Sequence, residues 1–122
     1  LDILENEIEH FFKKNKEIDA VFAVNELYAV TAMKVARNLN YRIPEDIQVI
    51  GFTDGVLSKH ARPSLTTVSQ HGQKIGEYSA NLLIDRLGLE RDDDDYDLDL
   101  EEDSNFQTVV IETELIERDS TK

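Results

Sequence analysis

The sequence predicts an α/β fold in which helices flank a parallel sheet. Two short segments, residues 18–24 and 47–52, are rich in β-branched and aromatic residues and almost free of charge, which is typical of parallel strands covered on both faces. Helical patterns lie before, between and after these segments. Strands that alternate with helices in this way form a parallel sheet with right-handed crossovers, and 122 residues are enough for one small domain with a modest core.

Two amphipathic helices are predicted in the first third of the chain. Residues 2–14 carry apolar side chains at spacings of three and four, as one face of a helix requires, namely Leu4, Ile8, Phe11 and Phe12. Residues 26–38 predict the second helix, whose narrow apolar arc is formed by Tyr28, Ala32, Val35 and Leu39. We therefore expect each helix to bury one face.

The pattern becomes irregular after the second predicted strand. Gly51, near the end of that strand, indicates either a bend or the close approach of another backbone. Residues 53–63 predict a loop with one helical turn around Ser58, and residues 65–68 predict a short extended piece.

The last third of the chain predicts one more helix and one more strand. Residues 72–88 form an amphipathic helix with Gly88 at the position of a helix C-cap. Residues 106–116 alternate between apolar and polar side chains over much of their length, which predicts a final strand. The side chains of the helix that are expected to turn inward are Ile75, Tyr78, Leu82 and Leu83.

The charge of the chain argues against contact with nucleic acid. There are 26 acidic and 13 basic residues, a formal net charge of −13, and nucleic-acid binders neutralise phosphates with Lys and Arg. Much of the excess lies in residues 89–104, which carry too little apolar surface to order themselves and are expected to form an acidic flexible loop. A calcium loop would need a glycine turn and fixed ligand positions, which this segment lacks.

The sequence contains none of the common catalytic signatures. It has no phosphate-binding glycine loop, no GxGxxG, no GxSxG and no cysteine, and its three histidines are not spaced as metal ligands. We therefore predict no enzyme activity, no cofactor and no metal site. No apolar run reaches the length of a membrane span.

Two segments carry a resemblance to a known family. Residues 18–52, IDAVFAVNELYAVTAMKVARNLNYRIPEDIQVIGF, resemble the stretch of LacI/GalR transcriptional regulators in which a strand ends in Ala-x-Asn-Asp, a helix follows, and a Pro-Glu-Asp turn leads to a Val-Ile-Gly-Phe strand. Residues 63–70, PSLTTVSQ, resemble the Pro-x-Leu-Thr-Thr-Val-x-Gln crossover of that family. The likeness covers about residues 16–88 and, more loosely, the last strand.

The resemblance implies the type I periplasmic-binding-protein-like fold, in which two α/β lobes clamp a small molecule. Only part of this domain is present in the sequence. By likeness, its segments are the C-terminal lobe (1–62), the interlobe crossover (63–70), a helix of the other lobe (71–88), the acidic loop (89–104), and a returning strand and tail (105–122). Without the remaining strands of the other lobe, we expect the apolar stripe of the 72–88 helix to find other cover and effector binding to be weak.

The implied function is the effector-sensing portion of a cytoplasmic, homodimeric repressor. The effector would be a sugar or a related small molecule, and operator DNA would be bound by an N-terminal helix-turn-helix outside this sequence. The alternative is the sugar-binding protein of an ABC importer, which shares the fold but usually lacks the Pro-x-Leu-Thr-Thr crossover. A third alternative, an enzyme of flavodoxin-like topology, is not supported, because the sequence contains no recognisable set of catalytic residues.

The resemblance also places ligand contacts at the carboxyl ends of the strands, where doubly wound sheets bind ligands. The matching positions are Asn25, Thr53, Asp54 and Gln70. The family usually has Asp where this chain has Thr53, so either the effector differs or Asp54 turns in to compensate. Asn25 is equally suited to cap the following helix.

A homodimer interface is implied on the helix that begins at Glu26 and on the loop of residues 55–62. Near the start of that helix, Leu27 and Val30 lie towards its polar side, where the other residues are mostly polar. The residues expected to meet a second copy are Leu27, Val30, Val56 and Leu57.

Overall fold

The computed structural model describes residues 2–88 and 107–122, which fall into two compact units. Unit 1 contains Leu1–Ser69 and Thr113–Lys122, and unit 2 contains Gln70–Glu112. The predicted acidic loop of residues 89–104 lies outside the described residues.

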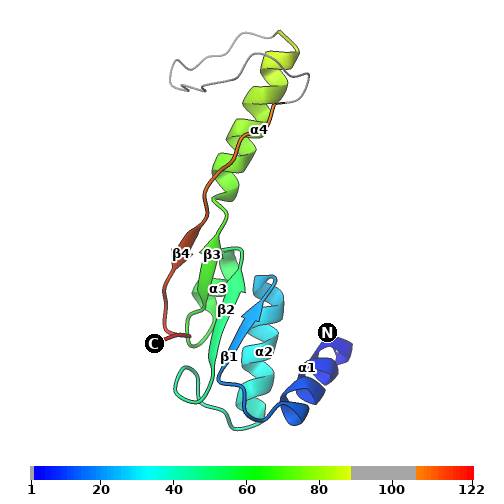
Figure 1. Ribbon diagram of the computed structural model, residues 1–122, viewed down its shortest axis with the longest axis vertical. Coiled ribbons are helices and arrows are strands. Elements are labelled where there is room, and N and C mark those ends of the chain that lie inside the picture. Colours follow the sequence, from blue (N-terminus) through cyan, green and yellow to red (C-terminus); the bar gives the residue numbers. More distant parts are fainter. Residues whose placement is uncertain (1, 89–106) are drawn as a thin grey trace. The chain divides into compact units, whose positions relative to one another are not determined.

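Unit 1 is built on a four-stranded sheet with the strand order β1-β2-β3-β4 (Figure 1). The strands β1, β2 and β3 are parallel, and β4 pairs with β3 in the antiparallel direction. The parallel part of the sheet and the helices beside it confirm the predicted fold class. The strand bounds are Ala20–Ala23 for β1, Gln48–Phe52 for β2, Thr66–Ser69 for β3 and Glu114–Ile116 for β4.

The helices of unit 1 follow the predicted order. α1 (Asp2–Lys14) and α2 (Glu26–Asn38) have the predicted bounds, and the helical turn expected around Ser58 is α3 (Val56–His60). α2 lies along the sheet, and α1 packs against α2 (Figure 1).

The core of unit 1 lies between α1, α2 and one face of the sheet. One cluster joins the two helices to the start of β2 and contains Phe12, Ala32, Val35, Ala36 and Ile47. A second cluster joins α2 to the three parallel strands and contains Ala23, Ala29, Met33, Val49 and Leu65. Gly51 explains how α2 comes so close to β2, because a Cβ at this position would lie 3.1 Å from Cβ of Ala29 and 3.0 Å from Cδ2 of Leu65. Cα of Glu26, in the backbone of α2, would lie 3.6 Å from the same Cβ, which supports the close approach of another backbone at Gly51.

The expectation that the first strand is covered on both faces is wrong for the described residues. Phe22 of β1 is 60% exposed and Val24 is similarly exposed, whereas Ala23 is buried beneath α2. Successive side chains of a strand point to opposite faces. The helices of unit 1 therefore cover one face of β1, and no described element covers the other.

The apolar face of α2 is also slightly different from the predicted arc. Ala32 and Val35 are buried as expected, but Tyr28 is 43% exposed, because Ala29 and Met33 take the central positions against the sheet. On α1, Phe12 is buried while its neighbour Phe11 is half exposed.

The last strand is much shorter than the predicted 106–116. Of the described residues in that range, only Glu114–Ile116 form a strand, and this strand is antiparallel. Strand structure depends on a hydrogen-bonding neighbour as well as on alternation, and β3 provides that neighbour only for these three residues.

Unit 2 contains α4 (Gly72–Arg86) and the segment that leads towards β4. The helix ends slightly earlier than predicted: Leu87 is its C-cap, and Gly88, which was expected at the C-cap, follows it with a left-handed φ of +65°. The predicted inward stripe, however, is not buried: no residue of α4 is buried, and Leu83 is exposed.

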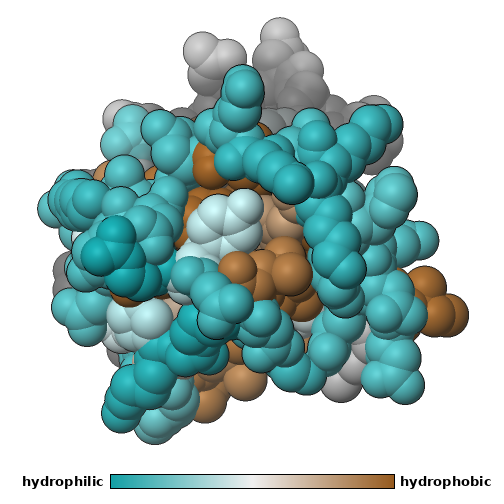
Figure 2. Space-filling model, turned by 90° about the horizontal axis from the view of Figure 1, so that it is seen from below, coloured by the Kyte–Doolittle hydropathy of each residue, from teal (hydrophilic) through white to brown (hydrophobic). Residues whose placement is uncertain are grey.

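The loop between α2 and β2 lies at the amino ends of the parallel strands. Seen from this end, hydrophobic surface at the centre is ringed by hydrophilic side chains (Figure 2).

In this loop, the side chain of Arg42 donates hydrogen bonds to both carboxylate oxygens of Asp46. Nη2 donates to Oδ1 at 2.6 Å, and Nε donates to Oδ2 at 2.8 Å. These side-chain bonds, together with a backbone bond from Arg42, lower the pKa of Asp46 to about 2.

Candidate functional site

The parallel strands bring two of the predicted ligand residues to one edge of the sheet. β1 and β2 are paired with Ala23 opposite Gly51. Asn25 and Thr53 each lie two residues beyond this pair in their own chain segments. They therefore occupy equivalent places at the carboxyl edge, where open α/β sheets bind ligands.

Asn25 is the N-cap of α2. Its backbone is extended, with φ −154°, and its Oδ1 accepts a hydrogen bond of 2.9 Å from the backbone N–H of Tyr28. This geometry satisfies one of the N–H groups that have no partner within the helix. The capping role considered for Asn25 is thus confirmed, and the ligand role stays a prediction.

Removing this cap is expected to destabilise the protein measurably. The substitution Asn25→Ala should lower the free energy of unfolding by about 1 kcal/mol, because the N–H of Tyr28 loses its acceptor. Urea denaturation followed by circular dichroism measures the loss. Asn25→Asp, which keeps an oxygen at the same place, should retain most of the stability, and an equal loss in both variants would contradict the capping role.

Thr53 adopts a backbone conformation that is rare for its type. Its φ is +78°, a left-handed value that costs a non-glycine residue about 1–3 kcal/mol and is least expected for a β-branched side chain. The backbone N–H of Thr53 donates a 3.0 Å hydrogen bond to the carbonyl of Val68 in β3. The position where this chain departs from the LacI/GalR pattern is therefore also a strained one.

Asp54 is held by an ion pair that the sequence analysis did not foresee. Its Oδ1 lies 2.6 Å from Nη2 of Arg118 and accepts a 2.9 Å hydrogen bond from Oγ1 of Thr67. The two charged side chains are only 16% and 15% exposed. Burial alone would raise the pKa of the Asp54 carboxyl, but the bonds from Arg118 and Thr67 and the charges of Arg118 and Lys59 outweigh it, so the pKa lies below its usual value.

Arg118 and Thr67 are thus site residues that sequence reasoning missed. Arg118 is separated from Asp54 by 64 positions (118 − 54) and lies in the segment predicted to be a returning strand and tail. The one available signal was a basic residue placed between two acidic ones, Glu117 and Asp119. Whether Asp54 also meets a ligand stays a prediction.

The predicted interface residues lie near a contact between α2 and α3. Oε2 of Glu26 accepts hydrogen bonds from the backbone N–H and the Oγ of Ser58, at 3.2 and 2.8 Å. Gly55 gives the Glu26 carboxylate its room, since a Cβ at that position would lie 2.1 Å from Oε1. Of the predicted interface residues, Val30 is partly buried and the other three are exposed: Leu27, Val56 and Leu57.

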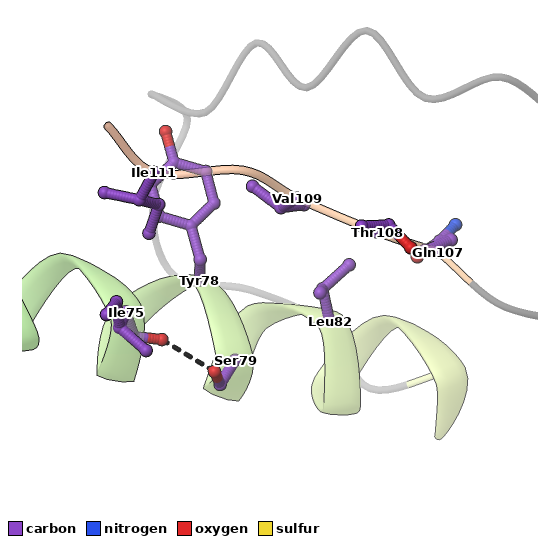
Figure 3. A pocket seen from close by; sticks show the side chains of 8 residues that line it. All are labelled: Ile75, Tyr78, Ser79, Leu82, Gln107, Thr108, Val109 and Ile111. Carbon is purple, nitrogen blue, oxygen red and sulfur yellow. Dashed lines mark hydrogen bonds between the residues drawn. The ribbon is translucent and has the colours of Figure 1, made fainter. Parts of the chain in front are cut away.

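Gln70, the fourth predicted ligand residue, follows β3 directly and is the first residue of unit 2. Unit 2 has an open groove of about 410 Å³ between α4 and the segment 107–111 (Figure 3). Three members of the predicted apolar stripe take part in its lining, which consists of Ile75, Tyr78, Ser79, Leu82, Gln107, Thr108, Val109 and Ile111.

Neither a metal cluster nor a membrane-spanning helix is present among the described residues. Residues 2–88 and 107–122 contain no group of three or more histidine, aspartate or glutamate side chains placed to hold a metal ion. In the same part of the chain, no helix is both long and apolar enough to cross a bilayer.

Comparison with known proteins adds three kinds of likeness. The family model described as periplasmic binding protein-like domain matches residues 5–121. The HTH-type transcriptional regulator MalR of Clostridium butyricum is 34% identical over 113 residues, which are 93% of this chain and 30% of that protein. The HTH-type transcriptional regulator CelR of Thermobifida fusca is 39% identical over 71 residues, 58% of this chain and 21% of that protein.

Solved structures show the same relationship. The complex of the transcriptional regulator CelR with cellobiose matches with a TM-score of 0.76 and 30% identity, over 98% of this chain and 33% of that one. A LacI family transcriptional regulator from Arthrobacter sp. FB24, in complex with lactose, matches in fold with a TM-score of 0.80 at 23% identity, over 98% of this chain and 41% of that one. The chain therefore spans between about a fifth and two fifths of these relatives.

Proposed function

Because the chain belongs to the periplasmic binding protein-like domain family, we propose that it is part of the effector-sensing domain of a LacI-type transcriptional repressor. The observation that carries this proposal is the match of the family model to residues 5–121, together with regulators as relatives over nearly the whole chain. The proposed effector is a sugar or a sugar derivative, in keeping with the cellobiose and lactose complexes of the structural relatives.

The carboxyl edge of the sheet supplies chemistry that suits a sugar. The cap of α2 uses only the oxygen of Asn25, and its amide nitrogen is a donor of the kind that sugar hydroxyls accept. Thr53 adds a hydroxyl, which donates and accepts. We propose that Asn25 and Thr53 contact the effector, with Asp54 and Gln70 as further contacts.

The whole protein would act as a homodimer whose lobes close on the effector and so change its affinity for DNA. Leu27, Val30, Val56 and Leu57 are the proposed dimer contacts. We propose that residues 1–62 belong to the C-terminal lobe and residues 71–88 to the other lobe, joined by the crossover of residues 63–70. DNA binding is assigned to a region outside this acidic sequence, which carries a net charge of −13. The proposed protein is not an enzyme and works in the cytoplasm.

The test uses the complete gene product that contains this sequence. Cellobiose, lactose and sucrose are each added in a thermal unfolding experiment, and a sugar that binds the folded state raises the melting temperature, by an amount that grows with its concentration. The same protein is then titrated onto a DNA fragment from upstream of its own gene, with and without that sugar. We expect the sugar to change the affinity for the fragment by about 5–150-fold, the usual range of allosteric coupling.

The importer alternative predicts a different pair of results. A sugar-binding protein of an ABC importer would be stabilised by a sugar but would not bind the DNA fragment. Sugar binding without DNA binding would therefore favour that alternative, and the absence of any response to all three sugars would argue against the proposed effector class.

A further inference from the structure

We propose that Arg118 is a positioning residue that holds the backbone of Thr53 in its left-handed conformation. In this role it would set the geometry of the effector site without touching the effector. The inference rests on the proposed function for its meaning, but the contacts that carry it lie entirely within unit 1.

The guanidinium group of Arg118 joins the C-terminal segment to two other parts of unit 1, the loop after β2 and the start of β3. Its Nη2 pairs with Asp54 in the loop after β2, at 2.6 Å. Its Nη1 donates hydrogen bonds to the backbone carbonyl of Leu65, at 2.7 Å, and to Oγ1 of Thr67 in β3, at 3.2 Å. A planar group with several fixed donors can hold these acceptors in one arrangement, which a lysine ammonium could not reproduce.

The strained residue has an anchor on each side. The N–H of Thr53 is bound to the carbonyl of Val68, and the side chain of the next residue, Asp54, is bound to Arg118 and to Oγ1 of Thr67. The left-handed φ lies between these two anchors. Strained conformations persist where the surroundings over-determine them, and they cluster at functional sites. Arg118 is the member of this arrangement that comes from the C-terminal segment.

A purely structural ion pair would behave differently. It would contribute to the stability of the fold, but Thr53 would keep its conformation without it. The two roles are therefore separated by a measurement made at Thr53 and not by the stability of the whole protein.

The experiment labels the threonines of the 122-residue chain with ¹³C and ¹⁵N and records the backbone signals of Thr53 by NMR. In Arg118→Met, which keeps the length of the side chain but removes the charge and the donors, we expect these signals to move from left-handed towards extended values. Arg118→Lys should give a smaller movement in the same direction. Arg42→Met is the matched control, because Arg42 also pairs with an aspartate, Asp46, but at the other end of the sheet. It should leave Thr53 unchanged.

Unchanged Thr53 signals in Arg118→Met would overturn the inference. If that variant does not fold, Arg118→Lys and Asp54→Asn, which keeps the shape of the side chain but not its charge, decide the question by the same measurement. In the complete gene product, Arg118→Met should also lower the affinity for the sugar that binds by about tenfold. If no sugar binds the unaltered protein, the proposed function fails while the result at Thr53 still stands.

Discussion

The substitution Phe12→Ala is expected to lower the free energy of unfolding by about 3–5 kcal/mol. Phe12 is 1% exposed and is the residue through which α1 enters the core. Its ring lies 5.9 Å from the ring of Tyr41, measured between centroids, so the same side chain also fixes the loop that leads to β2. Removing the ring leaves a cavity between α1 and the rest of the core, and α1 either shifts to fill it or leaves it empty. Urea denaturation followed by circular dichroism measures the loss.

The neighbouring residue provides a matched control. Phe11 carries the same side chain on the same helix but is 49% exposed. Phe11→Ala should therefore cost less than half as much, since free energy of burial scales with the apolar area removed from water. Equal losses in the two variants would mean that α1 docks in a different orientation from the one described.

The helices were the most predictable part of the fold. α1 and α2 begin and end where the spacing of apolar residues and the capping Asn25 indicate, because these signals are local and repeat every turn. Tyr28 was misplaced because aromatic residues satisfy an apolar pattern whether or not a neighbour covers them. The spacing of apolar residues predicts which stripe of a helix is apolar. Which residues at the edges of that stripe are buried depends on where the helix packs on the sheet.

The strands were less predictable, since they depend on partners far away in the chain. Phe22 has an aromatic side chain of the kind found in strands that are covered on both faces. It is exposed because no described element covers the second face of β1. The predicted last strand failed for the same reason, because alternation in residues 106–116 says nothing about which segment lies beside them.

At the candidate site, the sequence indicated the edge of the sheet but not its electrostatics. Asn25 and Thr53 could be placed because each directly follows a recognisable strand. The partner of Asp54 could not be found in this way, since an ion pair between distant residues leaves no periodic signal. Ser120 belongs to the same C-terminal segment, for which a tail was predicted, but it is fully buried.

Ser120→Val is expected to lower the free energy of unfolding by about 2–6 kcal/mol, because two buried backbone groups would each lose a hydrogen bond at about 1–3 kcal/mol. Oγ of Ser120 accepts a 2.8 Å bond from the N–H of Thr66 and donates a 2.6 Å bond to the carbonyl of Val49. Thr66 and Val49 belong to adjacent strands, and both are buried. The hydroxyl thus joins β2 to β3 at the place where the C-terminal segment enters between them.

The control for this change is Ser79→Val on the exposed surface of α4, where Oγ bonds only to the carbonyl of Ile75 in its own helix. That substitution should cost less than about 0.7 kcal/mol, the range of helix propensities for ordinary residues. Thermal and urea unfolding of the two variants measure the difference. The backbone N–H of Ser120 also donates to the carbonyl of Ser64, and its carbonyl accepts from the N–H of Val49. A small loss in Ser120→Val would therefore show that these backbone bonds alone hold the C-terminal segment in the sheet. A large loss would show that a single buried hydroxyl keeps in place the segment from which Arg118 reaches Asp54.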